Sequence, residues 1–463
     1  MIIRTLSFLA VTVLCTDLIQ AQTRIQILEP TGRIVGATID GEPVRKFLDN
    51  VRIATDRMVM DADSAWQFER RNLFQAFNVQ IKTENEIIWA DTLYYNTLLD
   101  ISSLRGRVII KSDQNILFSE EMEVDMNEDI AWFNVPVRFE DDQGTLLAES
   151  GIYYQRLDSA VFRGNVQLAD STQYLEADSL FMNRESDYYQ LFGNVYADDF
   201  EDRITFSGDY LEADSSGYRL LKGNAWMMRR NESETDTTHL LSDKIIVTET
   251  DTINTIDSYG DVKLWSPRFS AIADTALYDN NTEIFRLISN PIAWQKNIQL
   301  KGPFIEAHFV EDEISKLVSY INPIAVQEDT LTKRLNQMTG DTLIAYFEDG
   351  EIIQLDVFDD TEIIFHQKDE DGEPDGLLEM ISAGRATLTF FEGDPDEFRA
   401  EKQIEGSFLP EEPENINRKL DNFAWNPELK PQRPEIRIPR LPAIPEDRPF
   451  VLPPRYRVYS EAN

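Results

Sequence analysis

The chain has 463 residues, with 83 Asp and Glu against 44 Lys and Arg, and a formal net charge of −39. A surface of this sign repels nucleic-acid phosphate and excludes nucleic-acid binding as the function. The same charge is typical of a well-solubilised protein outside the cytoplasm, so it does not by itself indicate a cation site.

Residues 1–21 are predicted to be a cleaved secretory signal. Arg4 precedes an apolar run from Leu6 to Leu14, and Ala21 precedes a rise in polarity at Gln22 and Thr23. The run is shorter than the roughly 18 to 20 residues that span a bilayer, which disfavours a membrane anchor, and no later segment resembles a transmembrane helix. Cys15 is the single cysteine, and the bulky pair before it disfavours lipidation. The expected location is the periplasm or the periplasmic face of an outer membrane, with a mature chain free of cysteine.

A phrase close to Gly-Asn-Val recurs along the chain at a nearly constant interval. Clear copies begin at Gly164, Gly193 and Gly223. The apolar third position returns every 28 to 30 residues from Val51 to Ala225, and then at steps of 37, 30 and 32. A period of this size predicts an array in which each unit buries its apolar face against its neighbours. A single catalytic pocket is therefore not the first expectation.

One repeat, residues 173–197, predicts an antiparallel hairpin. Two segments rich in aromatic and β-branched residues flank a short polar linker at 183–187. Apolar and polar residues alternate from Leu175 to Asp178, and the alternation changes phase after Ser179. This change, together with Gly193 on the return strand, predicts a bend or bulge that carries each strand from one sheet into another.

An Ala-Asp phrase recurs where the strands change phase, as at Asp91, Asp178 and Asp274. We interpret these carboxylates as acceptors of hydrogen bonds from backbone N–H groups at the bend, and not as catalytic groups.

Residues 30 to 408 predict about 11 hairpins, roughly 22 long strands, and no helix of useful length. The predicted fold class is all-β, an elongated folded β-jelly roll built from tandem hairpin repeats of about 29 residues with an apolar interior. The expected domains are a signal peptide at 1–21, a first repeat block at 22–230, a second block at 239–408 and a proline-rich extended tail at 409–463.

The tail differs in composition from the repeats. It holds 11 of the 20 prolines, between Pro410 and Pro454, which predicts an extended and largely unfolded segment. From Asn415 onward it has nine Lys and Arg against six Asp and Glu, the reverse of the body. Two interpretations remain: a linker, or a segment that docks on a partner or on the protein's own acidic surface.

Catalytic signatures are weak. His239, His308 and His366 lack the spacing of a metal site, and nucleophile elbows, phosphate loops and dinucleotide fingerprints do not occur. A pair of carboxylates, as in glycosidases, remains the one enzymatic alternative. We expect no catalytic activity, no cofactor and no bound metal.

The segment from Gly164-Asn165-Val166 through Tyr174-Leu175-Glu176-Ala177-Asp178 to Gly193-Asn194-Val195 resembles the repeating pattern of the OstA-like family, the LptA-type lipopolysaccharide transport proteins. The resemblance covers most of residues 30 to 330 and, more faintly, the chain to about 408. It implies a jelly roll that shelters the acyl chains of lipopolysaccharide, or of a related envelope lipid, between two membranes. It also implies stacking on other OstA-like or jelly-roll envelope proteins. The chain departs from the pattern in its length, its two blocks and its proline-rich tail.

Candidates for lining such a groove come from the best-formed repeats: Val166, Leu168, Leu175, Ala177, Leu191 and Val195. The alternative for each residue is packing against the opposite sheet in a closed core. Exposed strand edges at the ends of the array would pair with partner domains. The rival functions are a structural surface repeat protein or adhesin with a filled core, and a carbohydrate-active parallel β-helix.

Overall fold

The computed structural model describes residues 26–444 apart from 55–57, 85, 113–115, 141–143, 184, 232–235, 251, 311–312, 370, 383 and 392–393. The expected signal segment, with Cys15, and the last part of the tail lie outside the described residues. The described chain forms two compact units. Unit 1 comprises the residues up to 201 with 210–215 and those from 438 onward, and unit 2 comprises 202–209 and 216–437.

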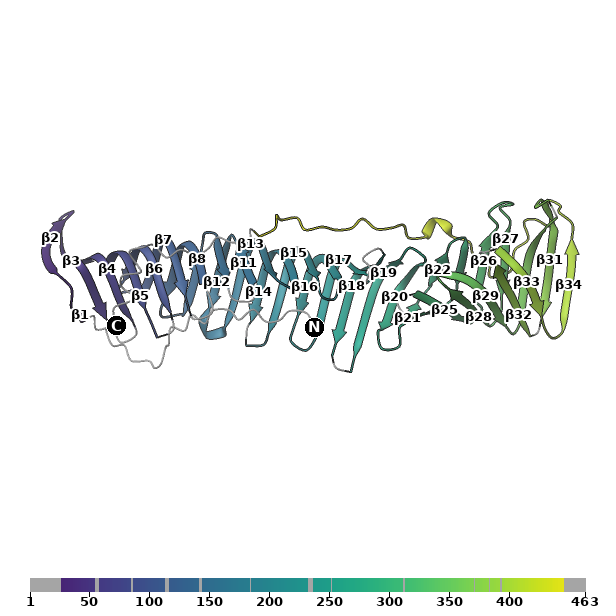
Figure 1. The fold of residues 1–463 in the computed structure, drawn as a ribbon, viewed down its shortest axis with the longest axis horizontal. Helices are drawn as coiled ribbons and strands as arrows, with labels where there is room; N and C mark the ends of the chain where they lie inside the picture. The colour runs from purple at the N-terminus through teal and green to yellow at the C-terminus, as the bar shows by residue number, and fades with distance from the viewer. Residues whose placement is uncertain are drawn as a thin grey trace. The chain divides into compact units, whose positions relative to one another are not determined.

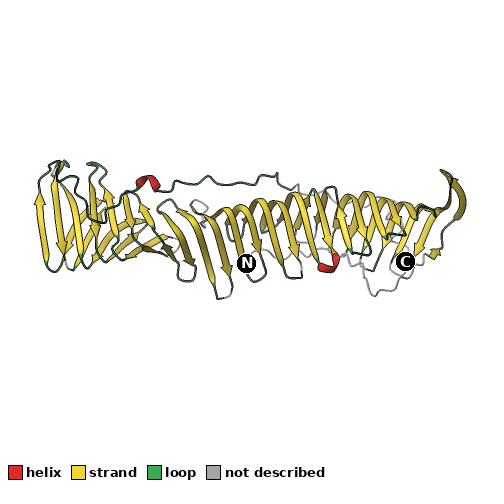
Figure 2. Ribbon diagram, turned by 180° about the vertical axis from the view of Figure 1, so that it is seen from behind, coloured by secondary structure: helices red, strands yellow, loops and turns green. Residues whose placement is uncertain are grey.

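Antiparallel strands are the main elements among the described residues of both units, which confirms the all-β jelly-roll class (Figures 1 and 2). The antiparallel registers exclude a parallel β-helix. Unit 1 contains β1 Gln26–Leu28, β2 Arg33–Ile39, β3 Glu42–Ala54, β4 Val59–Phe68, β5 Leu73–Lys82, β6 Ile87–Asn96, β7 Ile101–Lys111, β8 Ile116–Asp125, β9 Ile130–Phe133, β10 Val137–Glu140, β11 Gly144–Ala148, β12 Ser150–Tyr154, the 3₁₀ turn η1 Gln155–Leu157, β13 Ser159–Asp170, β14 Gln173–Asn183 and β15 Tyr188–Asp199.

The residues of β16, Ile204–Ala213, are divided between the units. Unit 2 continues with β17 Tyr218–Arg230, β18 Thr237–Glu249, β19 Asn254–Trp265, β20 Ser270–Asp279, β21 Ile284–Ile288, β22 Ile292–Gln295, β23 Ile298–Lys301, β24 Phe304–Val310, β25 Glu313–Tyr320, β26 Ile324–Glu328, β27 Leu335–Thr339, β28 Thr342–Glu348, β29 Glu351–Phe358, β30 Thr361–Lys368, β31 Pro374–Ser382, β32 Arg385–Phe391, β33 Asp394–Ala400, β34 Ile404–Leu409 and the 3₁₀ turn η2 Pro427–Leu429.

The Gly-Asn-Val phrase forms a bulge at which a strand passes from one sheet to the other. In β13 the register with β14 shifts between Arg163 and Val166. Before the shift β13 pairs with β12, and after it with β11. We call the sheet that contains the segments before the bulge wall A, and the sheet that contains those after it wall B. The predicted bend in mid-strand is confirmed.

In the later repeats of unit 2, each strand ends at the position where it would pass between the walls, and a separate strand begins on the other wall. β20 pairs with both β21 and β22. Wall A then continues through β24, β25, β28, β29, β32 and β33, and wall B through β23, β26, β27, β30, β31 and β34. The break between β21 and β22 contains Pro291, which has no N–H for a ladder. Together with the breaks between β9 and β10 and between β11 and β12 in unit 1, these breaks explain why the described chain has more strands than the roughly 22 that the sequence predicts.

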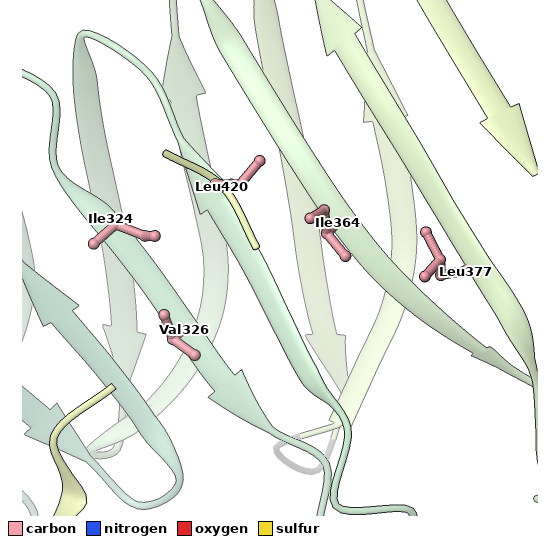
Figure 3. Packing of buried hydrophobic residues seen from close by; sticks show 5 residues of the cluster. All are labelled: Ile324, Val326, Ile364, Leu377 and Leu420. Carbon is pink, nitrogen blue, oxygen red and sulfur yellow. The ribbon is translucent and has the colours of Figure 1, made fainter. Parts of the chain in front are cut away.

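The tail packs on the face of wall B that points away from wall A. In unit 2, Leu420 is 8% exposed and clusters with Ile324, Val326, Ile364 and Leu377 (Figure 3). Phe423 and Trp425 pack beside them. Wall B is thus covered on both faces, which is why its segments, such as β22 and β23, are buried at nearly every position instead of every second one.

Candidate functional site

All six groove candidates are buried and point between the walls of unit 1. On wall B, Val166 lies opposite Ala177, and Leu168 lies opposite Leu175. Val195 lies two residues before Ala197, the partner of Leu175, and so shares their face. Leu191 belongs to wall A, opposite Leu180. Their exposed fractions range from 0% to 7%. The structure therefore brings these side chains together as the apolar inner surface of one pair of repeats.

The bulge that directs these side chains inward depends on two residues with positive φ. Gly193 has φ +72° and Asn194 has φ +48°. A Cβ on Gly193 would lie 2.4 Å from an Oδ of Asp178, so only glycine fits. Asn194 Nδ2 donates to the carboxylate of Asp178 over 2.8 Å.

The same contact recurs between Asn224 and Asp209, and between Asn165 and Glu149. Among the aspartates that the sequence predicts to accept hydrogen bonds at a bend, Asp178 accepts from Asn194 and Asp91 accepts from the guanidinium of Arg107. Both donors are side chains and not the backbone N–H groups that the sequence predicts.

Two cavities lie between the walls of unit 2, with volumes of about 30 and 20 Å³. Ile298 and Ala325 of wall B and Leu355 of wall A line both. Each holds about one water-sized sphere, whereas a cavity that takes up benzene measures roughly 150 Å³. At these two places the interior of unit 2 is too closely packed for a hydrocarbon chain.

The outer face of wall B in unit 2 holds the tail through two buried glutamines. Gln337 Nε2 donates to the carbonyl of Arg418, and Leu420 N–H donates to Gln337 Oε1, each over 3.0 Å. Gln299 repeats this pattern over 2.8 Å with Ala424 and Asn426. Each side-chain amide thus binds the backbone of residues i and i+2 of an extended peptide.

In unit 1 the corresponding face contacts tail residues from 438 onward. The backbone N–H groups of Arg440 and Leu441 donate to the two carboxylate oxygens of Glu176, over 2.7 and 2.9 Å. Gln167 Nε2 donates to the carbonyl of Pro442 over 2.7 Å and to the hydroxyl of Tyr174 over 2.8 Å. Burial raises the pKa of Tyr174 to about 12, so it remains a neutral phenol in this network.

A buried aromatic group on wall B of unit 2 faces two tail arginines. Trp226 Nε1 donates to His239 Nδ1 over 3.2 Å, and His239 packs edge-on against Trp265. The guanidinium groups of Arg437 and Arg433 lie over the rings of Trp226 and Trp265, at 5.5 and 5.6 Å from the ring centroids. Burial, and secondarily the charge of Arg433, lowers the pKa of His239 to about 4. His239 is therefore neutral at pH 7 and accepts the tryptophan N–H.

The sequence did not predict which residues contact the tail, although docking of the tail on the protein's own surface was one of the two interpretations. The signal was present in the composition of wall B. Its segments after the bulge, such as Ala225–Met228 and Ile324–Gln327, are apolar or amide-bearing without polar alternation. Such a pattern is typical of a strand that is covered on both faces.

The described residues contain no group of three or more His, Cys, Asp or Glu side chains placed to hold a metal ion. Glu86 is a lone buried carboxyl whose pKa burial raises to about 7. No helix among the described residues has the length and hydropathy to cross a membrane.

Comparison with known proteins gives two family matches. Residues 27–178 match the model of the OstA-like proteins, and residues 232–313 match that of the LptA/(LptD N-terminal domain) LPS transport proteins. Among solved structures, the chain is similar to LptH from Pseudomonas aeruginosa, described as the LptA-homologous periplasmic component of a lipopolysaccharide transport device. Identity is 12%, the match covers 31% of this chain and 95% of LptH, and the TM-score is 0.25. No curated protein matches the chain.

Proposed function

We propose that this chain, which belongs to the OstA-like family, is a non-enzymatic periplasmic protein of lipopolysaccharide transport or outer-membrane assembly. The apolar inner surface of unit 1 carries the proposal, because Val166, Leu175 and Val195 offer hydrocarbon-like contact along successive repeats. The cargo is lipopolysaccharide or a related envelope lipid.

The free energy of exposing an acyl chain to water explains the need for such a surface. Each CH₂ group left in water costs about 0.8 kcal/mol, so a 14-carbon chain costs roughly 11 kcal/mol. An apolar inner surface that repeats with every hairpin lowers this cost at each position. Transport then requires sliding between similar sites and no covalent chemistry.

Exposed edges of the walls supply the contact with partner proteins. In unit 2, Ile404 and Phe408 of β34 are 51% and 71% exposed. Phe408 lies opposite Leu378 in the register with β31, and its neighbour Leu409 packs on the tail side, so Phe408 faces the interior. In unit 1, Ile34 and Val35 of β2 are also exposed. Pairing with the edge of another jelly-roll protein would cover these side chains and continue the apolar interior.

Photo-crosslinking in cells tests the cargo. A photoreactive residue at Leu175 or Val195 is expected to capture envelope lipid. The exposed Arg163 provides the matched control on the outside of the strands. Glu176 is unsuitable as a control, because the tail covers it and it is 2% exposed. Equal lipid capture at Leu175, Val195 and Arg163 would contradict the proposal.

A second candidate function, a scaffold with a filled core, is favoured by the small cavities of unit 2. The same experiment separates the two functions when a probe is also placed at Leu355, which lines both cavities. Lipid capture in unit 1 alone assigns transport to unit 1 and a scaffolding role to unit 2. If neither the unit 1 probes nor the probe at Leu355 captures lipid, the result supports the scaffold function.

A further inference from the structure

The contacts of the tail in unit 2 differ from those of a strand in the sheet. Residues 418–426 lie across wall B without a backbone ladder, and their backbone is held by the side chains of Gln299 and Gln337. Detaching the tail therefore breaks side-chain hydrogen bonds, the ion pair between Arg418 and Glu379 and an apolar contact, but it leaves every described strand pairing of the walls intact. The tail behaves as a ligand of a surface that is already folded.

The surface recognises this ligand at defined positions. Leu420 enters the cluster around Val326 and Ile364, and Asn422 Nδ2 donates to Thr339 Oγ1 over 2.7 Å and to Asn322 Oδ1 over 2.9 Å. Lys430 Nζ donates to the carbonyl of Lys296 over 2.8 Å. Apolar, amide and cationic groups at fixed spacing define a peptide site with its own sequence preference.

The connection from β34 to this site is short and has no strand partner. Residues 410–417 form turns, with hydrogen bonds from Asn415 N–H to Glu412 and from Arg418 N–H to Asn415. A segment joined to its own body by such a connection can be exchanged between identical molecules at low cost, because every contact made in one molecule is available in another.

We propose that the outer face of β23, β26, β27, β30 and β31 is a peptide-binding site that accepts residues 418–430 of a second copy of this chain in exchange for its own. The exchange links two copies through their tails, separately from any pairing of strand edges. It depends on no lipid and is independent of the proposed transport function.

Two full-length variants with complementary defects test the exchange. The acceptor carries Leu420→Ser and Phe423→Ser, which weaken its tail and leave the site intact. The donor carries Gln299→Ala and Gln337→Ala, which weaken its site and leave the tail intact. A 1:1 mixture is expected to form heterodimers with an affinity at least tenfold above the self-association of either variant, measured by sedimentation or native mass spectrometry.

The control mixture pairs the acceptor with a donor that also carries Leu420→Ser and Phe423→Ser. Its association reports contacts at strand edges alone, because neither chain then has an intact tail. Circular dichroism and thermal unfolding establish that each variant is folded. If the acceptor does not fold, Leu420→Ala replaces its two substitutions, and if the donor does not fold, Gln337→Ala replaces its two substitutions. Equal association in the two mixtures would overturn the proposal, whatever the outcome of the lipid experiment.

In the wild-type chain the intramolecular tail competes with the exchanged one. A tethered segment has an effective concentration in the millimolar range, so wild-type chains are expected to remain closed on themselves at micromolar concentration. A synthetic peptide of residues 415–430 should therefore bind the acceptor variant at least tenfold more tightly than it binds the wild-type chain. Equal binding to both would show that the tail does not occupy the site as a competitor.

Discussion

At the scale of single residues, the bulge depends on backbone conformations that most side chains avoid. Gly193 and Asn194 both have positive φ, and Asp178 closes the space where a Cβ would stand. Gly193→Ala is expected to lower the free energy of unfolding by about 1–3 kcal/mol through backbone strain and the contact with Asp178. Urea denaturation of the purified chain measures the change.

Gly36→Ala is the matched control, because nothing lies within 4 Å of a Cβ at that position. A change within about 0.5 kcal/mol is expected there, as at most exposed sites. Similar losses for the two variants would show that the effect is a general cost of replacing glycine and not a property of the bulge.

His239 makes stability depend on pH in a defined direction. Its pKa is about 4 in the folded chain and 6.5 in its ordinary state. Between these values the unfolded chain binds a proton that the folded chain does not, so stability is lost as the pH falls through this window, by up to about 3 kcal/mol. His239→Gln should reduce the difference between urea midpoints at pH 7 and pH 4.5.

Some pH dependence should persist in that variant, because burial also lowers the pKa of His308 and His366. An unchanged difference between the two midpoints would mean that His239 titrates normally in the folded chain.

At the scale of elements, each glutamine anchor of the tail can be removed separately. Gln337→Ala deletes two hydrogen bonds to residues 418 and 420 and is expected to speed hydrogen exchange at the Leu420 amide about tenfold, which corresponds to about 1.4 kcal/mol. Gln354→Ala is the control, since Gln354 lies on wall A and donates its hydrogen bond to Asp356 of the same strand. If both variants exchange alike at Leu420, the glutamine does not hold the tail.

The elements that depend on local sequence were predictable, and those that depend on distant contacts were not. The change of phase after Ser179 and the glycine at 193 predict the bend, because alternation and positive φ are properties of a few adjacent residues. The inward direction of Leu175 and Val195 follows from the same alternation. The residues that bind the tail could not be predicted from the sequence, because Gln299 and Ala424 are 125 residues apart and no repeat relates them.

At the scale of the whole molecule, the proposed pairing of strand edges makes a prediction about the association of copies of this chain. Phe408 is 71% exposed at the interior side of β34. Phe408→Lys is expected to weaken self-association at this edge at least tenfold, because an edge lysine must lose its hydration when another strand covers it. Sedimentation velocity over a concentration series measures the effect.

Ile438→Lys is the comparison, since Ile438 is 75% exposed on the tail and lies outside any strand. Equal association of the two variants would show that β34 is not a contact edge.

Each bulge contact joins the two strands of one hairpin, Asp178 of β14 to Asn194 of β15 and Asp209 of β16 to Asn224 of β17, so the period of about 29 residues has an evolutionary consequence. Duplication or loss of one complete hairpin inserts or deletes a bulge together with its carboxylate and asparagine. The apolar side chains of the new hairpin then face the interior, as those of its neighbours do. Gain or loss of a fraction of a hairpin would break this alignment. Each duplication would extend the ladder by two strand spacings, about 10 Å. Lineages can therefore change the reach of such a protein in discrete steps without redesigning its core.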